Sequence, residues 1–138
     1  LAAIIRREPH HQAFLDVLGS VDVAYINPVV ISEVHYLLSV SGKVAAARSF
    51  LEDVGNGFYT VVEPQPGDYH AAADLIEQYR GSISRKRPKP GSIDLADAMN
   101  VITAAHQQTN VIITTDQGYR WIAPTSGHTG FRLLPWDL

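Results

Sequence analysis

Four carboxylates stand near the ends of expected strands, where an α/β protein binds its ligands. Glu33 lies in the first turns of a helix that follows one strand, and Asp116 ends another strand. Asp94 and Asp97 lie in the first turns of the helix that leads into this second strand. Ligands of open parallel sheets bind beyond the carboxyl ends of the strands, so we expect the four acids to gather there. Carboxylate oxygens with retained waters are typical ligands of Mg²⁺ or Mn²⁺.

The helix expected from residue 93 to about residue 107 carries the sharpest local signal. At about 100° per residue, Asp94 and Asp97 share a face with Val101 and Ala104, which are small and apolar. Two like charges at ~4 Å repel by roughly 4 kcal/mol at an effective dielectric of about 20. No Lys or Arg is adjacent, so a cation is the simplest compensation. We expect this helix to point Leu95, Ala98, Met99, Ile102 and Ala105 inward and Asn100, Thr103 and Gln107 toward solvent.

Each acid also has a simpler interpretation. Asp94 and Glu33 can stabilise a helix N-terminus through the helix dipole, and Asp116 can be a turn residue ahead of Gly118. Asp97 lies deeper in its helix, which weakens the dipole interpretation there. The joint placement of the four acids, rather than any one of them, indicates a metal site.

Composition narrows the chemistry further. The chain has 138 residues and a net charge of −3, and 46% of its residues are hydrophobic and 18% charged. These values exclude a disordered chain and a broadly basic nucleic-acid-binding coat. The absence of cysteine excludes disulfides, thiolate zinc sites and a Cys nucleophile, so metal ligands must be Asp, Glu or His. No apolar run approaches the ~18 residues of a membrane-spanning helix, and we expect a cytoplasmic protein.

Apolar periodicity predicts helices and strands in alternation. We expect helical segments over residues 1–6, 9–18, 29–40, 43–54, 68–80 and 93–107, and strands over residues 21–27, 58–62, 111–115 and 131–134. Residues 81–91 and 121–130 are expected to be loops. Strands joined by helical crossovers predict an α/β fold with a parallel, covered sheet, in a single domain over residues 1–138.

Three motifs and a closing segment carry a resemblance to a known family. They are Asn27-Pro28-Val29-Val30-Ile31-Ser32-Glu33-Val34, Asp94-Leu95-Ala96-Asp97-Ala98, Val111-Ile112-Ile113-Thr114-Thr115-Asp116 and Phe131-Arg132-Leu133-Leu134-Pro135. In order and spacing the chain resembles the PIN-domain family, especially its VapC-type toxin ribonucleases, over essentially its whole length. The resemblance implies a three-layer α/β/α sandwich with a central parallel sheet. It also implies Mg²⁺- or Mn²⁺-dependent cleavage of RNA phosphodiester bonds.

The resemblance assigns roles by position in these motifs. Glu33, Asp97 and Asp116 match the family's catalytic, metal-binding acids, and Asp94 is an additional nearby acid that binds metal directly or through water. The resemblance further implies a cognate antitoxin that blocks the cleft, an RNA substrate and a homodimer. A weaker expectation is that a hydroxyl group orients a ligand, either from Thr114 or from Thr115.

One element of the family pattern has no counterpart here. The family's sheet opens with a central strand that carries an Asp, whereas Leu1 would already lie in the following helix. We expect such a strand to precede Leu1. Without it, the chain would be a degenerate PIN scaffold that binds RNA or a partner without cleavage. A receiver-type signalling domain is a more distant alternative, because it needs an early paired acidic run and a late strand-end Lys, and the only lysines are Lys43, Lys86 and Lys89.

A basic run precedes the helix that carries Asp94 and Asp97. It lies in an expected loop, where it could bind RNA phosphates close to the metals. The simpler interpretation is a solvated loop, because many basic runs serve solubility alone. The residues of this run are Arg85, Lys86, Arg87 and Lys89.

Overall fold

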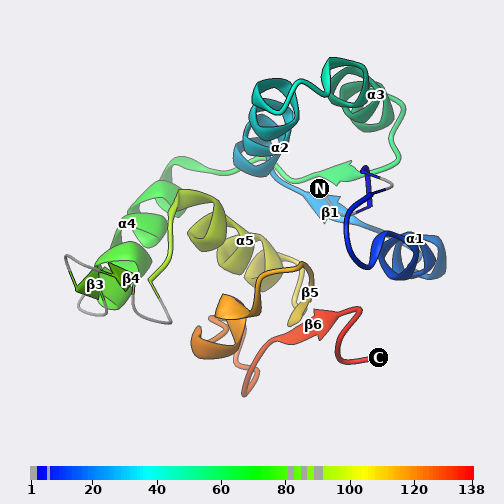
Figure 1. The fold of residues 1–138 in the computed structure, drawn as a ribbon. Helices are drawn as coiled ribbons and strands as arrows, with labels where there is room; N and C mark the ends of the chain where they lie inside the picture. Colours follow the sequence, from blue (N-terminus) through cyan, green and yellow to red (C-terminus); the bar gives the residue numbers. More distant parts are fainter. Residues whose placement is uncertain (1–2, 6, 81–82, 85–86, 89–91) are drawn as a thin grey trace. The chain divides into compact units, whose positions relative to one another are not determined.

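A computed structural model describes residues 3–5, 7–80, 83–84, 87–88 and 92–138, which form two compact units, Leu1–Glu63 and Pro64–Leu138. The first unit contains α1 (His11–Ser20), β1 (Tyr25–Ile26), α2 (Pro28–Val40), α3 (Val44–Gly55) and β2 (Thr60–Val61). The second contains α4 (Pro66–Arg80), β3 (Ile83–Ser84), β4 (Arg87–Pro88), α5 (Leu95–His106), β5 (Val111–Ile113), the 3₁₀ helix η1 (Gln117–Trp121) and β6 (Arg132–Leu134) (Figure 1). Among these described elements, no helix combines the length and apolar character needed to cross a membrane.

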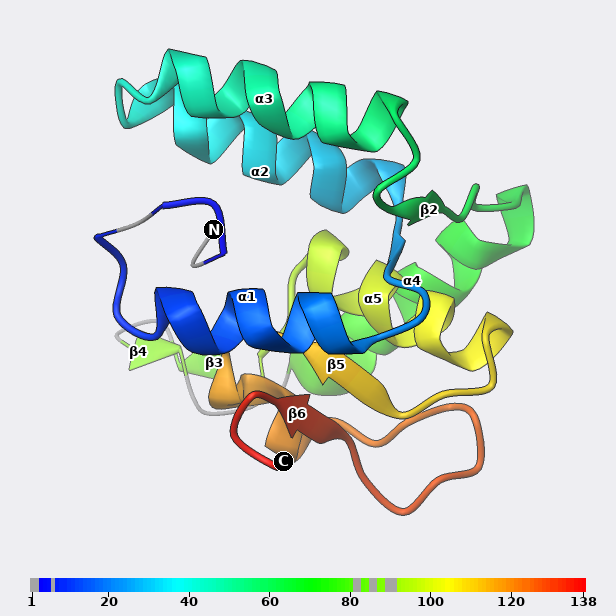
Figure 2. The same ribbon diagram turned by 90° about the vertical axis from the view of Figure 1, so that its right-hand side faces the viewer.

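The first unit is built on a short parallel ladder between β1 and β2. Tyr25 lies opposite Thr60, and Ile26 lies opposite Val61. The helices α2 and α3 lie side by side on one side of the ladder, and α1 lies on the other (Figure 1 and Figure 2). The core cluster of this unit consists of Leu38, Ala47 and Phe50, with Ile4, Ile5, Ile26, Ile31, Val34, Ala46, Val54 and Tyr59 packed against them.

Asn27 sets the start of α2 directly after β1. Its side-chain oxygen accepts a hydrogen bond from the Val30 N–H at 3.1 Å, and Pro28 takes the first helical position, where a missing N–H costs nothing. Asn27 is completely buried. This cap places Glu33 in the second turn of α2, beyond the carboxyl end of β1.

The second unit is organised around α5, which packs beside α4 and against β5 (Figure 1). The strands β5 and β6 are parallel, in a register that runs from Val111 opposite Arg132 to Ile113 opposite Leu134. Because α5 is apolar over most of its circumference, neighbouring elements cover it on several sides. Its buried residues are Ala96, Ala98, Met99, Val101, Ile102 and Ala104.

The predicted α/β fold class is confirmed, and so is the parallel pairing of strands joined by helices. The strands are shorter than predicted. Those in the described part pair two by two, β1 with β2, β3 with β4 and β5 with β6, rather than in one continuous sheet.

Three local predictions are wrong. Residues 3–5 form a turn and an irregular residue rather than the end of a helix. The segment 81–91, predicted as a loop, contains the antiparallel pair of β3 and β4. The helix predicted from residue 93 begins at Leu95, because Asp94 caps it. Asp is among the strongest N-cap residues, and here its carboxylate reaches the N–H three positions along.

Candidate active site

Asp94 and Asp97 cap the N-terminus of α5 reciprocally. The Asp94 Oδ1 accepts the Asp97 N–H at 3.0 Å, and the Asp97 Oδ2 accepts the Asp94 N–H at 3.2 Å. This arrangement is a capping box in which both side chains are aspartates. The interpretation of Asp94 as a helix-start residue is therefore confirmed. The same geometry fixes two carboxylates side by side.

Asp116 is held at the carboxyl end of β5 by its own turn. Its Oδ1 accepts the Gly118 N–H at 2.6 Å, and its N–H donates to the Thr114 Oγ1 at 3.0 Å. Thr114 extends the pairing of β5 with β6, since its N–H donates to the Leu134 carbonyl at 3.1 Å. Thr114 thus orients the Asp116 turn, whereas Thr115 is exposed.

Asp97 is half-buried and lies in the field of two other acids. Burial raises the pKa of its carboxyl, and the charges of Asp94 and Asp116 raise it further, against a lowering by the Asp94 N–H. None of the ion pairs found among the described residues involves any of these three acids. A cation placed here would relieve both the burial of charge and the mutual repulsion.

Two residues that the sequence analysis did not select also belong to this site. Tyr119 is 2% exposed, and its hydroxyl lies close enough to the Asp97 carboxylate to lower the pKa of that carboxyl. The Asn100 Nδ2 donates to the same hydroxyl at 2.9 Å. The prediction that Asn100 faces solvent is wrong, because η1 supplies a buried partner for it. Tyr119 follows Asp116 by three residues, a one-turn spacing in η1 that could have drawn attention to it.

The inward side of α5 also differs from the prediction at its first residue. Leu95, which was expected to point into the core, is 42% exposed. It occupies the first position after the cap, where the helix has no preceding turn and few neighbours cover the side chain.

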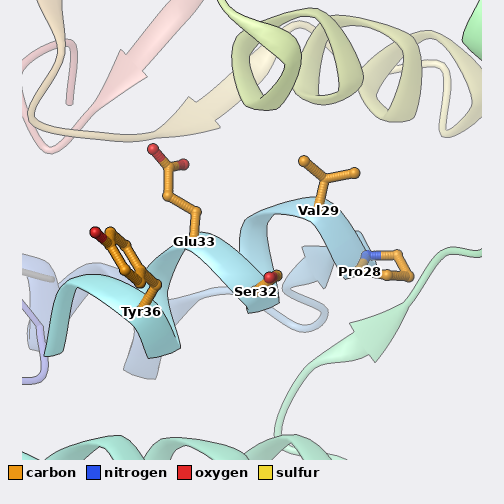
Figure 3. A pocket seen from close by; sticks show the side chains of 5 residues that line it. All are labelled: Pro28, Val29, Ser32, Glu33 and Tyr36. Carbon is orange, nitrogen blue, oxygen red and sulfur yellow. The ribbon is translucent and has the colours of Figure 1, made fainter. Parts of the chain in front are cut away.

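Glu33 lies on an exposed face of α2 in the first unit. It lines an open pocket of about 480 Å³ together with Pro28, Val29, Ser32 and Tyr36. Figure 3 shows Glu33 and Val29 projecting from the same side of the helix. Since the aspartates of α5 and of η1 belong to the second unit, the grouping of Glu33 with them stays a prediction.

The oxygen donors of the second unit fit a hard divalent cation. A carboxylate offers about four lone-pair positions, and the described hydrogen bonds occupy one each on Asp94, Asp97 and Asp116. No group of three or more Asp, Glu or His side chains is gathered closely enough to hold a metal ion, as far as the described residues extend. Mg²⁺ commonly binds through one or two carboxylates and keeps several waters, so a smaller set of acids suffices.

The basic run can be placed only in part. Arg85, Lys86 and Lys89 lie outside the described residues, and Arg87 is described only as backbone in β4. Its role toward RNA stays a prediction.

Comparison with known proteins agrees with these motifs. The PIN domain family model matches residues 1–123. The chain is also similar to Ribonuclease VapC26 of Mycobacterium tuberculosis, with 25% identity over 136 residues that cover 98% of this chain and 94% of the relative. The receiver-type alternative therefore has no support. The family model covers most of the chain, and it agrees with the motifs around Glu33, Asp97 and Asp116 and with the parallel α/β architecture. The chain therefore belongs to the PIN-domain family.

Proposed function

We propose that this protein is an endoribonuclease toxin that depends on Mg²⁺ or Mn²⁺, cleaves RNA phosphodiester bonds and is inhibited by a cognate antitoxin. Membership of the PIN-domain family and the printed name of the relative, a ribonuclease, support this proposal. The observation that carries it is the position of Asp97, which is half-buried near Asp94 and Asp116 with no ion-pair partner among the described residues.

The proposed roles follow from where each acid is held. Asp97 and Asp116 bind the cation, Asp94 binds it directly or through water, and Glu33 contributes from the first unit. When bound, the cation lowers the pKa of its water and neutralises charge on the scissile phosphate. The capping box and the Thr114 contact keep the carboxylates preoriented, so little reorganisation is needed when the cation arrives.

The proposed partners complete this function. RNA phosphates would be held by Arg85, Lys86, Arg87 and Lys89, because phosphate contacts by Lys and Arg supply affinity without reading sequence. An antitoxin protein would cover the acids, and the toxin would act as a homodimer in the cytoplasm. These partners rest on the family resemblance and on the relative.

One observation favours a second candidate, a PIN scaffold that binds RNA or a partner without cleavage. Asp94 and Asp97 are both engaged as helix caps, and no three acids meet within the described part of the chain. In that case the acids serve the helix, and removing one charge would leave no catalytic defect.

The Asp97→Asn variant separates the two candidates. For the nuclease, we expect the wild-type protein to bind Mn²⁺ in calorimetry and to cut RNA only with the metal. In the variant, the Mn²⁺ affinity and the rate of RNA cleavage should each fall by at least about 100-fold. Loss of a metal ligand should have a larger effect than loss of an outer-shell partner, which typically costs about 10–100-fold. Asp74→Asn, an exposed acid of α4, is the matched control and should behave as wild type. Equal metal-dependent cleavage by wild type and Asp97→Asn would overturn the site assignment.

A further inference from the structure

The Tyr119 hydroxyl is a buried polar group that has Asn100 and Asp97 as neighbours. Its oxygen accepts a hydrogen bond from the Asn100 Nδ2 at 2.9 Å. A tyrosine hydroxyl has one proton to give, and the Asp97 carboxylate lies close enough to the same hydroxyl for the two groups to shift each other's pKa. Because an amide N–H can only donate and an ionised carboxylate can only accept, the hydroxyl proton is available to Asp97 rather than to Asn100. The order of these groups is Asn100, Tyr119 and Asp97.

The Tyr119 ring itself has little freedom to move. It packs in a T-shaped arrangement with the Phe131 ring, with centroids 6.0 Å apart and planes at 83°. The ring lies in η1, which begins at the Asp116 cap, and only 2% of the residue is exposed. Because the ring is constrained, its hydroxyl has a fixed position and can restrict the orientation of a neighbouring carboxylate.

Two donors from different elements lie beside the Asp97 carboxylate. The Asp94 N–H hydrogen-bonds it at 3.2 Å from the start of α5, and the Tyr119 hydroxyl of η1 lowers the pKa of the carboxyl. A carboxylate with donors on two sides has a restricted orientation, and at least half of its four lone-pair positions stay available to a cation. Second-shell hydrogen bonds of this kind orient metal ligands and typically contribute 10–100-fold to metal affinity.

We propose that Tyr119 and Asn100 form a positioning pair that orients the Asp97 carboxylate toward its divalent cation. The proposal rests on the proposed function, since it takes Asp97 as a metal ligand. Neither residue of the pair touches substrate. A structural role alone would need the tyrosine ring and not the direction in which its proton points.

The test removes the hydroxyl and keeps the ring. Tyr119→Phe should weaken Mn²⁺ binding in calorimetry by about 10-fold, within the 10–100-fold range of outer-shell partners. The RNA cleavage rate at saturating RNA should fall similarly, with the KM for RNA unchanged. Tyr79→Phe is the matched control, because it also removes a hydroxyl that accepts a hydrogen bond, in this case from the Ala123 N–H at 2.9 Å. It should bind Mn²⁺ as wild type does.

A double variant separates positioning from stability. Tyr119→Phe leaves Asn100 with a lost partner, whereas Tyr119→Phe with Asn100→Leu replaces both polar groups by apolar ones, which can be nearly neutral for folding. We expect the double variant to regain stability toward urea while Mn²⁺ binding stays about 10-fold weaker. Recovery of wild-type Mn²⁺ affinity in the double variant, or no loss in Tyr119→Phe, overturns the positioning role.

The Asp97→Asn variant tells which proposal has failed. If Asp97→Asn loses Mn²⁺ binding and Tyr119→Phe does not, the positioning role is wrong and the metal site stands. If Asp97→Asn binds Mn²⁺ as wild type does, or wild type binds none, both proposals fall.

Discussion

Asp68 and Asp97 occupy the same kind of position in two neighbouring helices, α4 and α5, yet their surroundings act on their charges in opposite directions. Each acid lies in the first turn of its helix and accepts a backbone N–H from three residues upstream. The Gln65 N–H donates to Asp68 at 2.8 Å, and the Asp94 N–H donates to Asp97 at 3.2 Å. The local hydrogen bonding is the same in kind.

The two acids differ in the charges around them. The hydrogen bond from Gln65 lowers the pKa of Asp68, and His106 lowers it further, with its Nε2 2.8 Å from the Asp68 Oδ1. Burial raises the pKa of Asp97, and the charges of Asp94 and Asp116 add to that. The protein therefore stabilises the charge of Asp68 by its own groups, whereas no ion pair among the described residues stabilises the charge of Asp97.

This difference separates a structural acid from the proposed metal ligand within a single unit. A helix-cap motif by itself does not tell the two apart, because both acids satisfy a backbone donor. The side chains around each acid distinguish the two, since a partly buried carboxylate without a basic partner is a candidate functional residue. Three substitutions test the contrast between Asp68 and Asp97.

The largest effect is expected for Asp116→Asn. An Asn side-chain oxygen can still accept the Gly118 N–H, so the turn and the stability toward urea should be retained. The loss of one carboxylate near Asp97 should reduce metal-dependent RNA cleavage by at least about 100-fold, more than an outer-shell change. Cleavage assays with Mn²⁺ and urea unfolding measure the two quantities. Unchanged cleavage would remove Asp116 from the functional side of the comparison.

An intermediate effect is expected for Gly118→Ala. A Cβ at this position would lie 2.9 Å from the Asp116 Oδ1, so the carboxylate must turn away and lose its hydrogen bond from the Gly118 N–H. We expect Mn²⁺ affinity to fall by about 10-fold, at the lower end for an outer-shell change. Gly67→Ala in α4 is the control, since nothing lies within 4 Å of a Cβ there. Wild-type Mn²⁺ affinity in Gly118→Ala would mean that the Asp116 orientation is unimportant.

The smallest effect on function is expected for Asp68→Ala, which should leave Mn²⁺ affinity unchanged. It should lower the free energy of unfolding by about 1–3 kcal/mol, because it removes the contacts with Gln65 and His106 together. Asp74→Ala on the exposed face of α4 should change stability by no more than about 0.5 kcal/mol. Urea unfolding at pH 7 measures both. A weaker Mn²⁺ site in Asp68→Ala would contradict the division between the two acids.

The stability difference between wild type and Asp68→Ala should depend on pH in a defined direction. The folded-state pKa of Asp68 is lowered, so its contribution is fully present above the unfolded value of about 3.9. The contribution is lost as the pH falls through the folded-state pKa. The unfolding free energies of wild type and Asp68→Ala should therefore differ at pH 7 and approach each other as the pH falls into this acidic range. A difference that grows on acidification would contradict the lowered pKa of Asp68.

Features that depend on residues a few positions apart follow from the sequence alone. The helical periodicity of residues 29–40 and 43–54 and the turn at Asp116 arise from local contacts. The motifs around Glu33, Asp97 and Asp116 were enough to identify the PIN-domain family, because the family is recognised by the order of these motifs along the chain. The strand ends were predicted less well, since ladder length depends on the partner strand.

The side of α5 that faces a partner, and the groups that surround each acid, depend on tertiary contacts. Asn100 looked solvent-exposed by periodicity, but it bonds Tyr119, 19 residues later in the chain. Asp68 meets His106 across 38 residues, and no pattern in either helix predicts that contact. Such contacts depend on how elements fold back on one another, and burial and charge, which set the pKa of an acid, are properties of that arrangement rather than of the neighbouring residues.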